Sequence, residues 1–281
     1  MQRNYSIDVE GTQGITTDEM VYGLLIVLLI FVIVTLYFYI KKRSKKPGKA
    51  YEIKHLLHKY FIYYRYLSQK DKMVFEARVF RFIQEKEFIP RNFREVTSEM
   101  KILIAATAVQ ITFGLPEITL RHFKRIIIYP DTYYSTLTGK YHKGEVNPGV
   151  QSIVLSWKSF VEGFQHPDDS LNLGLHEMAH ALEVENLIEN GESNFLSTAI
   201  LERWRNCIEP VMEEIKSGKN TFFRAYAAHN EQEFFAVAVE NFFERPEAFR
   251  RQYPELYDTL AALLNQNPLK LGLTDNDRVY L

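Results

Sequence analysis

A run of 20 residues without a charged side chain, at positions 21–40, restricts the topology of this chain more than any other feature. A helix of this length can cross a hydrocarbon core about 30 Å thick. Tyr22, Tyr37 and Tyr39 lie towards the ends of the run, where amphipathic rings favour the lipid–water interface. We therefore expect one transmembrane helix at 21–40.

A cleaved signal peptide and a buried core helix are the alternatives for this run. The run is longer than the usual apolar region of a signal peptide, an acidic segment precedes it, and no A-x-A site follows it. Apolarity on every face over about five turns argues against a core helix. The transmembrane helix is therefore the favoured prediction.

The charges on either side of 21–40 are asymmetric. Six Lys or Arg side chains lie within 41–49, whereas the first 20 residues carry Arg3 against four acidic side chains. The positive-inside rule then places 1–20 outside the cell and residues 41–281 in the cytoplasm. We expect a tail at 1–20, a transmembrane helix at 21–40, a basic linker at 41–50 and one domain at 51–281.

The pattern beyond the linker predicts an α+β domain that is mostly helical with a small sheet. Apolar spacing predicts helices at 51–66, from Ser68 to about Lys86, at 97–113, and over most of the chain after Asp168. Runs rich in β-branched residues predict strands at 124–129 and 151–157, with a loop or hairpin between them. A single cysteine excludes an intrachain disulfide and a thiolate-rich metal site, and the net charge of −1 gives no case for nucleic-acid binding.

The segment NLGLHEMAHALEVE contains the pattern H-E-x-x-H at His176, Glu177 and His180. Residues four apart lie on one face of a helix, so both imidazoles can bind one metal ion. Glu177 is one residue further round the helix, where its carboxylate can act as a general base on a metal-activated water. The alternative is a buried helix whose two histidines are satisfied by hydrogen bonds.

A catalytic zinc needs a third protein ligand. The extended pattern of the metzincins is excluded, because Glu183 and Asn186 stand where it requires Gly and His. We expect a carboxylate from the helix NEQEFFAVAVENFFE, and its spacing leaves Glu231, Glu233 and Glu240 as candidates. These glutamates could instead cap the helix or face solvent. Glu183, one turn after His180, could accept a hydrogen bond from the N–H group of a metal-binding imidazole, or it could be exposed to solvent.

Two segments with their spacing resemble a known family. The run LSWKSFVEGFQHPDDSLNLGLHEMAHALE, followed after about fifty residues by EQEFFAVAVENFFERPEAF, resembles the Mlc titration factor A family of bacterial zinc peptidases. Upstream segments resemble the same family in the same order, so that the resemblance covers roughly 67–250. The family is similar in fold to the catalytic domain of anthrax lethal factor, which implies a zincin-like metallopeptidase domain.

The resemblance implies roles for individual residues. Glu233 would be the third ligand of one zinc ion per chain, and Tyr226, seven residues earlier, would stabilise the oxyanion of the tetrahedral intermediate. The family usually has Asp at the position of Glu183, where an imidazole-binding role is implied; Glu240 is a second candidate for such a role. The chain departs from the family pattern in two ways. Glu183 is longer than the usual Asp, and the apolar run at 21–40 has no counterpart in the known titration factor, which is soluble.

The expected function is therefore that of a zinc-dependent peptidase anchored by 21–40 in a bacterial inner membrane, and the family resemblance implies aminopeptidase activity. Its partners would be a peptide or protein substrate and the membrane. The alternative is a tethered protein that sequesters a transcriptional regulator, because the family's partner in enterobacteria is a glucose-responsive repressor. We expect a substrate peptide to pair with an exposed strand edge at 151–157. Alternatively that strand is central, and 124–129 or the intervening loop provides the edge.

Overall fold

The structure is a computed structural model, and it places the chain in two units that are described separately here. The first unit is Met1–Lys49 and the second is Ala50–Leu281. Within them the structure describes residues 28–36, 47–115, 118–136, 138–165, 171–188, 198–219 and 222–275.

Only part of the expected transmembrane segment lies within this described part of the chain. Residues 28–36 are helical with exposed side chains, whereas 21–27 and 37–40 lie outside the described residues, as do the tail 1–20 and positions 41–46 of the expected linker. Among the described helices, none reaches the length and apolarity that crossing a membrane requires.

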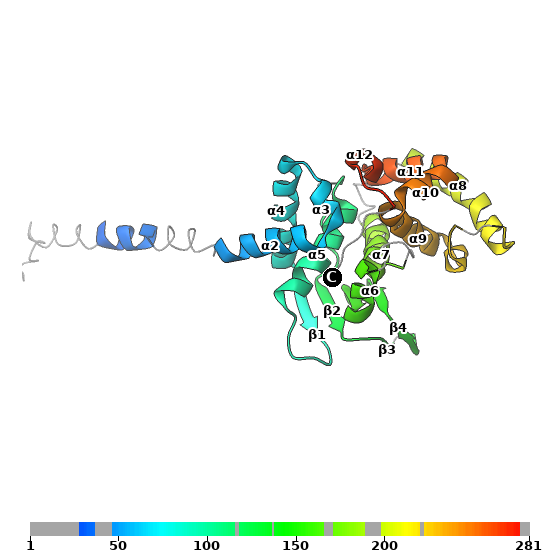
Figure 1. The fold of residues 1–281 in the computed structure, drawn as a ribbon. Coiled ribbons are helices and arrows are strands. Elements are labelled where there is room, and N and C mark those ends of the chain that lie inside the picture. Colours follow the sequence, from blue (N-terminus) through cyan, green and yellow to red (C-terminus); the bar gives the residue numbers. More distant parts are fainter. Residues whose placement is uncertain are drawn as a thin grey trace, which may run out of the picture. The chain divides into compact units, whose positions relative to one another are not determined.

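The second unit is mostly helical with a small sheet, as the sequence predicts (Figure 1). Its helices are α2 (Pro47–Tyr60, of which the part from Ala50 onward belongs to this unit), α3 (Ile62–Tyr66), α4 (Gln69–Glu85), α5 (Ser98–Thr112), α6 (Trp157–Gln165), α7 (Leu173–Ile188), α8 (Thr198–Lys216), the 3₁₀ helix η1 (Ala225–Ala228), α9 (Glu231–Glu244), α10 (Pro246–Gln252), α11 (Pro254–Leu264) and α12 (Pro268–Leu271). Its strands are β1 (Glu87–Pro90), β2 (Arg125–Tyr129), β3 (Tyr133–Ser135), β4 (Lys140–His142), β5 (Gly144–Asn147) and β6 (Ser152–Ser156).

Local signals explain where several of these helices begin. The Ser68 hydroxyl accepts the backbone N–H of Asp71 at 3.1 Å, so the predicted cap starts α4. Thr97 caps α5 in the same way, through the N–H of Met100 at 3.2 Å. Helix α5 is apolar on nearly all faces and is buried from Ile102 to Thr112, as expected for a helix that packs on several sides.

The four-stranded sheet has the order β1-β2-β6-β5. Strands β1, β2 and β6 are parallel, and β5 runs antiparallel to β6. A separate hairpin pairs β3 with β4. Strand β1 was not predicted, because its four residues end at Pro90 and resemble a chain break.

The prediction that 151–157 forms the open edge is wrong. Strand β6 pairs with β2 on one side and with β5 on the other, so it is central. All five of its residues are buried, including the small side chains of Ser152 and Ser156. The edge strands are β1 and β5. The edge beside α7 is β5, which comes from the intervening segment that the sequence left open as a loop or hairpin.

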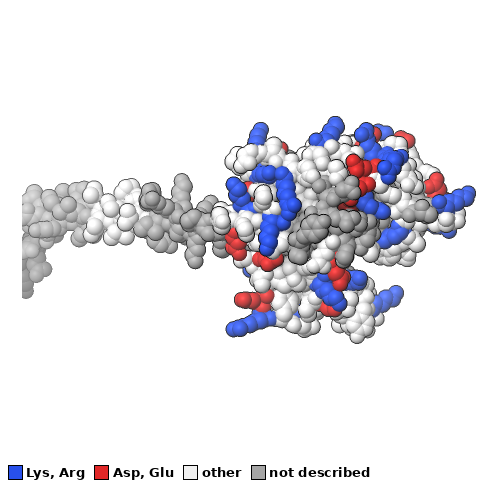
Figure 2. Space-filling view, in the orientation of Figure 1, with Lys and Arg blue, Asp and Glu red and all other residues white. Residues whose placement is uncertain are grey.

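Helix α7 occupies the centre of the unit. It packs against α5 and α9 and also touches β5 and β6. The buried side chains of these elements belong to one hydrophobic core. Charged side chains of both signs lie on the outer surface of the face shown in Figure 2. The H-E-x-x-H residues therefore lie on a helix that is held from several sides, next to the edge strand.

Candidate metal centre

Three side chains from α7 and α9 converge on one point. The Nε2 atoms of His176 and His180 lie 3.1 Å apart. Glu233 Oε2 lies 3.2 Å from the His176 nitrogen and 3.4 Å from the His180 nitrogen. Helical spacing brings the two imidazoles together, and packing of α9 on α7 adds the carboxylate.

The spacing of these three atoms fits a tetrahedral metal ion. Ligand atoms bound at zinc distances of 2.0–2.1 Å to one tetrahedral centre lie roughly 3.3 Å apart. Glu233 Oε2 is buried and has no hydrogen-bond partner in the described part of the chain. A buried carboxylate oxygen without such a partner is costly, and a bound cation would satisfy it. Two imidazoles and a carboxylate are also the donor set that zinc accepts at catalytic sites.

The remaining candidate from the first turn of α9 lies elsewhere. Glu231 is exposed and its nearest cation is Arg205, at 3.9 Å. Glu233 takes its position from the start of the helix, because the Asn230 side chain accepts the Glu233 N–H at 2.8 Å. The cap thus fixes the backbone of the residue whose carboxylate faces the imidazoles.

Glu177 is enclosed beside the imidazoles and has only 6% of its surface exposed. Burial raises the pKa of its carboxyl; the two histidines oppose this effect, and Glu233 and Glu240 add to it. Its carboxylate lies against the Cα atom of Gly144, and a β-carbon at that position would overlap the carboxylate. The glycine at the start of β5 therefore leaves room for Glu177 between the motif helix and the edge strand.

Glu240 binds the far side of the His176 ring. Its Oε1 accepts a hydrogen bond from His176 Nδ1 at 2.7 Å, which orients the ring with Nε2 towards Glu233 and His180. Arg224 binds both oxygens of Glu240, with Nη2–Oε1 2.7 Å and Nη1–Oε2 2.8 Å. The fully buried carboxylate of Glu240 is thus bound by a bidentate guanidinium and a backbone N–H.

The two histidines favour the charged state when no metal is bound. Burial lowers the pKa of His176, but hydrogen bonds to Glu233 and Glu240 outweigh this effect and raise the pKa to about 9. Burial also lowers the pKa of His180, but Glu183 and Glu233 raise it to about 10. Burial raises the pKa of Glu233, but both histidines lower it more strongly, so that its carboxyl stays ionised. The ionised carboxylate of Glu233 therefore lies between two imidazoles, an arrangement in which a metal cation can replace the protons of the rings.

Glu183 and Tyr226 complete the surroundings of the ligands. Glu183 Oε2 lies 3.8 Å from His180 Nδ1, close enough for an ion pair but too far for a hydrogen bond. The Tyr226 hydroxyl donates to Glu233 Oε1 at 2.9 Å. Burial, followed by the charge of Glu233, raises the pKa of Tyr226 to about 12, so its hydroxyl remains a proton donor.

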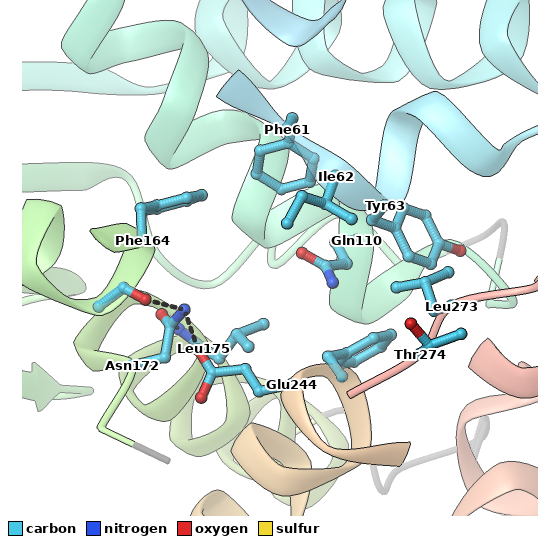
Figure 3. Close-up of a pocket in the computed structure, with 12 residues that line it drawn as sticks. Phe61, Ile62, Tyr63, Gln110, Phe164, Asn172, Leu175, Glu244, Leu273 and Thr274 are labelled. Atoms are coloured by element: carbon cyan, nitrogen blue, oxygen red, sulfur yellow. Dashed lines mark hydrogen bonds between the residues drawn. The ribbon is translucent and has the colours of Figure 1, made fainter. Parts of the chain in front are cut away.

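Asn172 ties the beginning of α7 to α9. Its side-chain oxygen accepts the N–H of Leu175 at 3.0 Å and caps α7, and its backbone N–H donates to Glu240 Oε2 at 2.9 Å. Its side-chain amide donates to Glu244 at 2.9 Å, on the side of α7 shown in Figure 3. One residue therefore sets both the start of the motif helix and its register against the helix that carries Glu233.

A cleft of about 530 Å³ opens onto these residues. Its floor includes His176, Glu177, Tyr226 and Glu240. Its walls come from Tyr141–Gly144, from Ser159 and Glu162 on α6, and from Leu171 and Leu173 at the start of α7. The smaller cavity in Figure 3, about 60 Å³, lies between α3, α5 and the ends of α6 and α9 and contains none of the three converging side chains. A substrate can therefore reach the site through the larger cleft.

Residues 39–264 match the family described as glucose-regulated metallo-peptidase M90. The chain belongs to this family. The match covers most of the second unit, including both helices of the metal centre, and the M90 family is one of metallopeptidases. The resemblance on which the sequence analysis relied is therefore confirmed.

Individual M90 relatives cover similar lengths of the chain. "Mlc titration factor A" of Escherichia coli O7:K1 is 28% identical over 225 residues, which cover 73% of this chain and 82% of that protein. The protein of the same name from Shigella flexneri serotype 5b is 27% identical over the same length. An uncharacterised Synechocystis protein is 25% identical over 222 residues, covering 74% of this chain and 81% of its own length.

The structure thus brings together every residue that the sequence nominated, apart from Glu231. Sequence reasoning missed Arg224, Asn172 and Gly144. Arg224 lies two residues before Tyr226 in a segment without periodicity, so no pattern links it to a glutamate 16 positions later. The glycine at 144 could have been noted only if the segment had been recognised as a strand beside the motif helix.

Proposed function

We propose that this chain is a zinc-dependent peptidase whose second unit hydrolyses peptide bonds. The observation that carries the proposal is the convergence of His176 Nε2, His180 Nε2 and Glu233 Oε2 within 3.4 Å of one another, with Glu177 enclosed beside them. When bound by these three ligands, zinc supplies Lewis acidity, which polarises the substrate carbonyl and makes water a better nucleophile at neutral pH.

The residues of the chain divide the proton transfers and the charge stabilisation between them. Glu177 accepts the proton of the attacking water and passes it to the leaving amine, and its raised pKa suits both transfers. Tyr226 faces the same cleft, and its hydroxyl can donate to the oxygen that becomes negative in the transition state. Glu240 and Arg224 keep the His176 ring oriented throughout.

The edge strand β5 offers a binding line for an extended peptide. Ser156 N donates to Lys143 O at 2.7 Å, and this bond fixes which residues of β5 face β6. Bonded pairs alternate in an antiparallel ladder, so the N–H and C=O groups of Gly144 and Val146 point to the open edge. A peptide paired with these groups would pass directly over Glu177, which contacts Gly144.

Replacing Glu177 with Gln tests the catalytic assignment. Gln has nearly the same shape but cannot accept the proton of water, so we expect cleavage of a peptide library to fall at least ~100-fold while zinc content stays at one per chain. The matched control is Glu231→Gln, which alters an exposed carboxylate of α9 and should keep both properties. Unchanged turnover in the Glu177 variant would remove this residue from the mechanism.

A second candidate function is the capture of a transcriptional regulator. It is favoured by the name of the Escherichia coli relatives, "Mlc titration factor A", which share 28% identity with the chain. Comparison of the wild-type chain with Glu177→Gln separates the two functions. A regulator held only by binding would be captured intact by both forms, whereas a substrate would be cleaved by the wild-type chain and captured intact only by the variant.

The proposal also includes an anchor in a bacterial inner membrane through residues 21–40, with the second unit in the cytoplasm. Its support is the length of the uncharged run and the basic residues that follow it. Such an anchor would restrict the peptidase to substrates that reach the membrane surface.

A further inference from the structure

Exposed apolar side chains gather around the cleft over the metal centre. Tyr141, Leu171 and Tyr226 are 76%, 55% and 51% exposed, and all three line this cleft. Most other large apolar side chains of the second unit are buried in its core. Exposed apolar groups that meet at a concave site and are bordered by polar residues are typical of a binding surface.

Tyr141 belongs to the β3–β4 hairpin, where its ring packs against a second tyrosine ring. Tyr141 lies opposite Tyr134 in the register of the hairpin, and their rings meet edge to face at 5.5 Å. The neighbouring Tyr133 points the other way, is buried, and stacks on Tyr129 of β2 at 4.4 Å. Side chains alternate along a strand, so the buried ring anchors the hairpin while the exposed pair faces away from the core.

The part of the lining that comes from the start of α7 is apolar as well and lies next to the metal ligands. Leu173 is three residues before His176, so it lies on the same face of α7, one turn earlier. Leu171 precedes it at the rim of the cleft. The lining also carries charged groups of both signs, among them Lys143 and Glu162. The cleft therefore does not select for one sign of charge, whereas both the β3–β4 hairpin and the start of α7 contribute apolar side chains to it.

We propose that Tyr141, Leu171 and Leu173 form a subsite for a bulky apolar side chain of the substrate. This inference rests on the proposed function, because it takes the occupant to be a peptide that lies along β5. A peptide paired with Gly144 and Val146 continues past Gly144 towards Lys143 and Tyr141, so its next side chains enter the space between the hairpin and α7. The residue that the subsite selects is therefore adjacent to the scissile bond, on the side away from Val146.

The test measures binding separately from cleavage. The full chain carrying Glu177→Gln is purified in detergent, loaded with zinc and titrated with peptides that differ at one position, which holds Ala, Lys, Asp, Leu or Phe. We expect Leu and Phe to bind at least ~10-fold more tightly than Ala, Lys or Asp at one position of the series, because a pocket resolves apolar groups of different size by about this factor.

The variants Tyr141→Ser and Leu173→Ala should each reduce this preference, and the combination should abolish it. Tyr51→Ser is the matched control, since it removes a tyrosine that is 73% exposed on α2 and lies outside the cleft lining. Equal binding of all five peptides, or a preference that survives in the double variant, would overturn the inference. Apolar preference in binding without any cleavage by the wild-type chain would support the subsite while refuting the peptidase assignment.

Discussion

At the scale of single residues, the carboxylate behind His176 separates a metal site from a chance pair of histidines. Glu240 is fully buried, and its charge is compensated by Arg224, His176 and the backbone N–H of Asn172. An ionised carboxylate at such a place costs several kcal/mol unless it is paired. The arrangement fixes one imidazole tautomer, which a purely structural pair of core histidines does not require.

Replacing Arg224 with Gln should therefore weaken metal binding. The variant leaves Glu240 buried with less compensation and releases the orientation of His176, so we expect zinc affinity to fall by about 10–100-fold. Competition with a chromogenic chelator measures this change. Arg224→Lys should lie between wild type and the Gln variant, because an ammonium cannot bind both carboxylate oxygens in the same plane.

The control for this prediction is Arg203→Gln, which breaks an exposed ion pair with Glu255 at 3.4 Å. Exposed pairs of this kind contribute little to stability, so zinc affinity should not change. Equal zinc affinities of wild type and Arg224→Gln would show that the guanidinium does not position the ligand.

Zinc binding should release protons. Burial lowers the pKa of both imidazoles, but the surrounding carboxylates raise it to about 9 for His176 and about 10 for His180 in the metal-free protein. Both rings are then charged at pH 7, whereas zinc binds only neutral imidazole. We expect roughly two protons per zinc to be released at pH 7, measured by calorimetry in two buffers with different ionisation enthalpies.

The same protonation makes the stability of the metal-free protein depend on pH. The folded-state pKa values lie above the ordinary histidine value of 6.5, so the stabilisation is complete below pH 6.5 and is lost as the pH rises through 9 to 10. The melting temperature of the chelator-treated protein should fall over this range. Zinc binding without proton release, together with a melting temperature that does not fall, would contradict the charged state of the two rings.

At the scale of secondary-structure elements, the sequence predicted the helices better than the sheet. The caps at Ser68 and Thr97 and the apolar periodicity define α4 and α5 from local information alone. Strand order depends on contacts between distant segments. The sequence predicted an open edge at 151–157, but β5 covers it. Strand β5 is only four residues long and has no composition typical of a strand. Small side chains at Ser152 and Ser156 reflect close packing rather than exposure.

Pairing along β5 predicts that N-methylation weakens substrate binding at every second amide of the peptide. Substrate amides that pair with Gly144 and Val146 should not tolerate N-methylation, because the methyl group removes a hydrogen bond and blocks the approach to β5. We expect about a tenfold rise in KM for each such methylation. Methylation of the intervening amide, which points away from β5, is the matched control. Equal sensitivity at successive positions would contradict pairing along this edge.

At the scale of the whole molecule, the metal centre depends both on the spacing of residues within one helix and on the packing of two helices that are distant in the sequence. The second unit, from Ala50 onward, has its own hydrophobic core, which holds α7 and α9 against each other and so brings Glu233 to the two histidines. The H-E-x-x-H spacing could be predicted from sequence because it lies within one helix. The position of Glu233 followed only from family resemblance, since it depends on how two helices pack 50 residues apart along the chain.

Membrane orientation is a property of the whole chain, and charge asymmetry predicts it. Six basic side chains at 41–49 follow the uncharged run 21–40, and four acidic side chains precede it. Basic flanks stay on the cytoplasmic side, so a reporter fused after Leu281 should be active only if it functions in the cytoplasm. Neutralising all six basic residues removes the asymmetry and should give a mixed orientation, with activity appearing from a periplasmic reporter. Deleting residues 1–40 should move the protein from the membrane fraction to the supernatant. Periplasmic activity of the unaltered fusion would reverse the orientation, and supernatant location of the full chain would remove the anchor; either result would place the peptidase among different substrates.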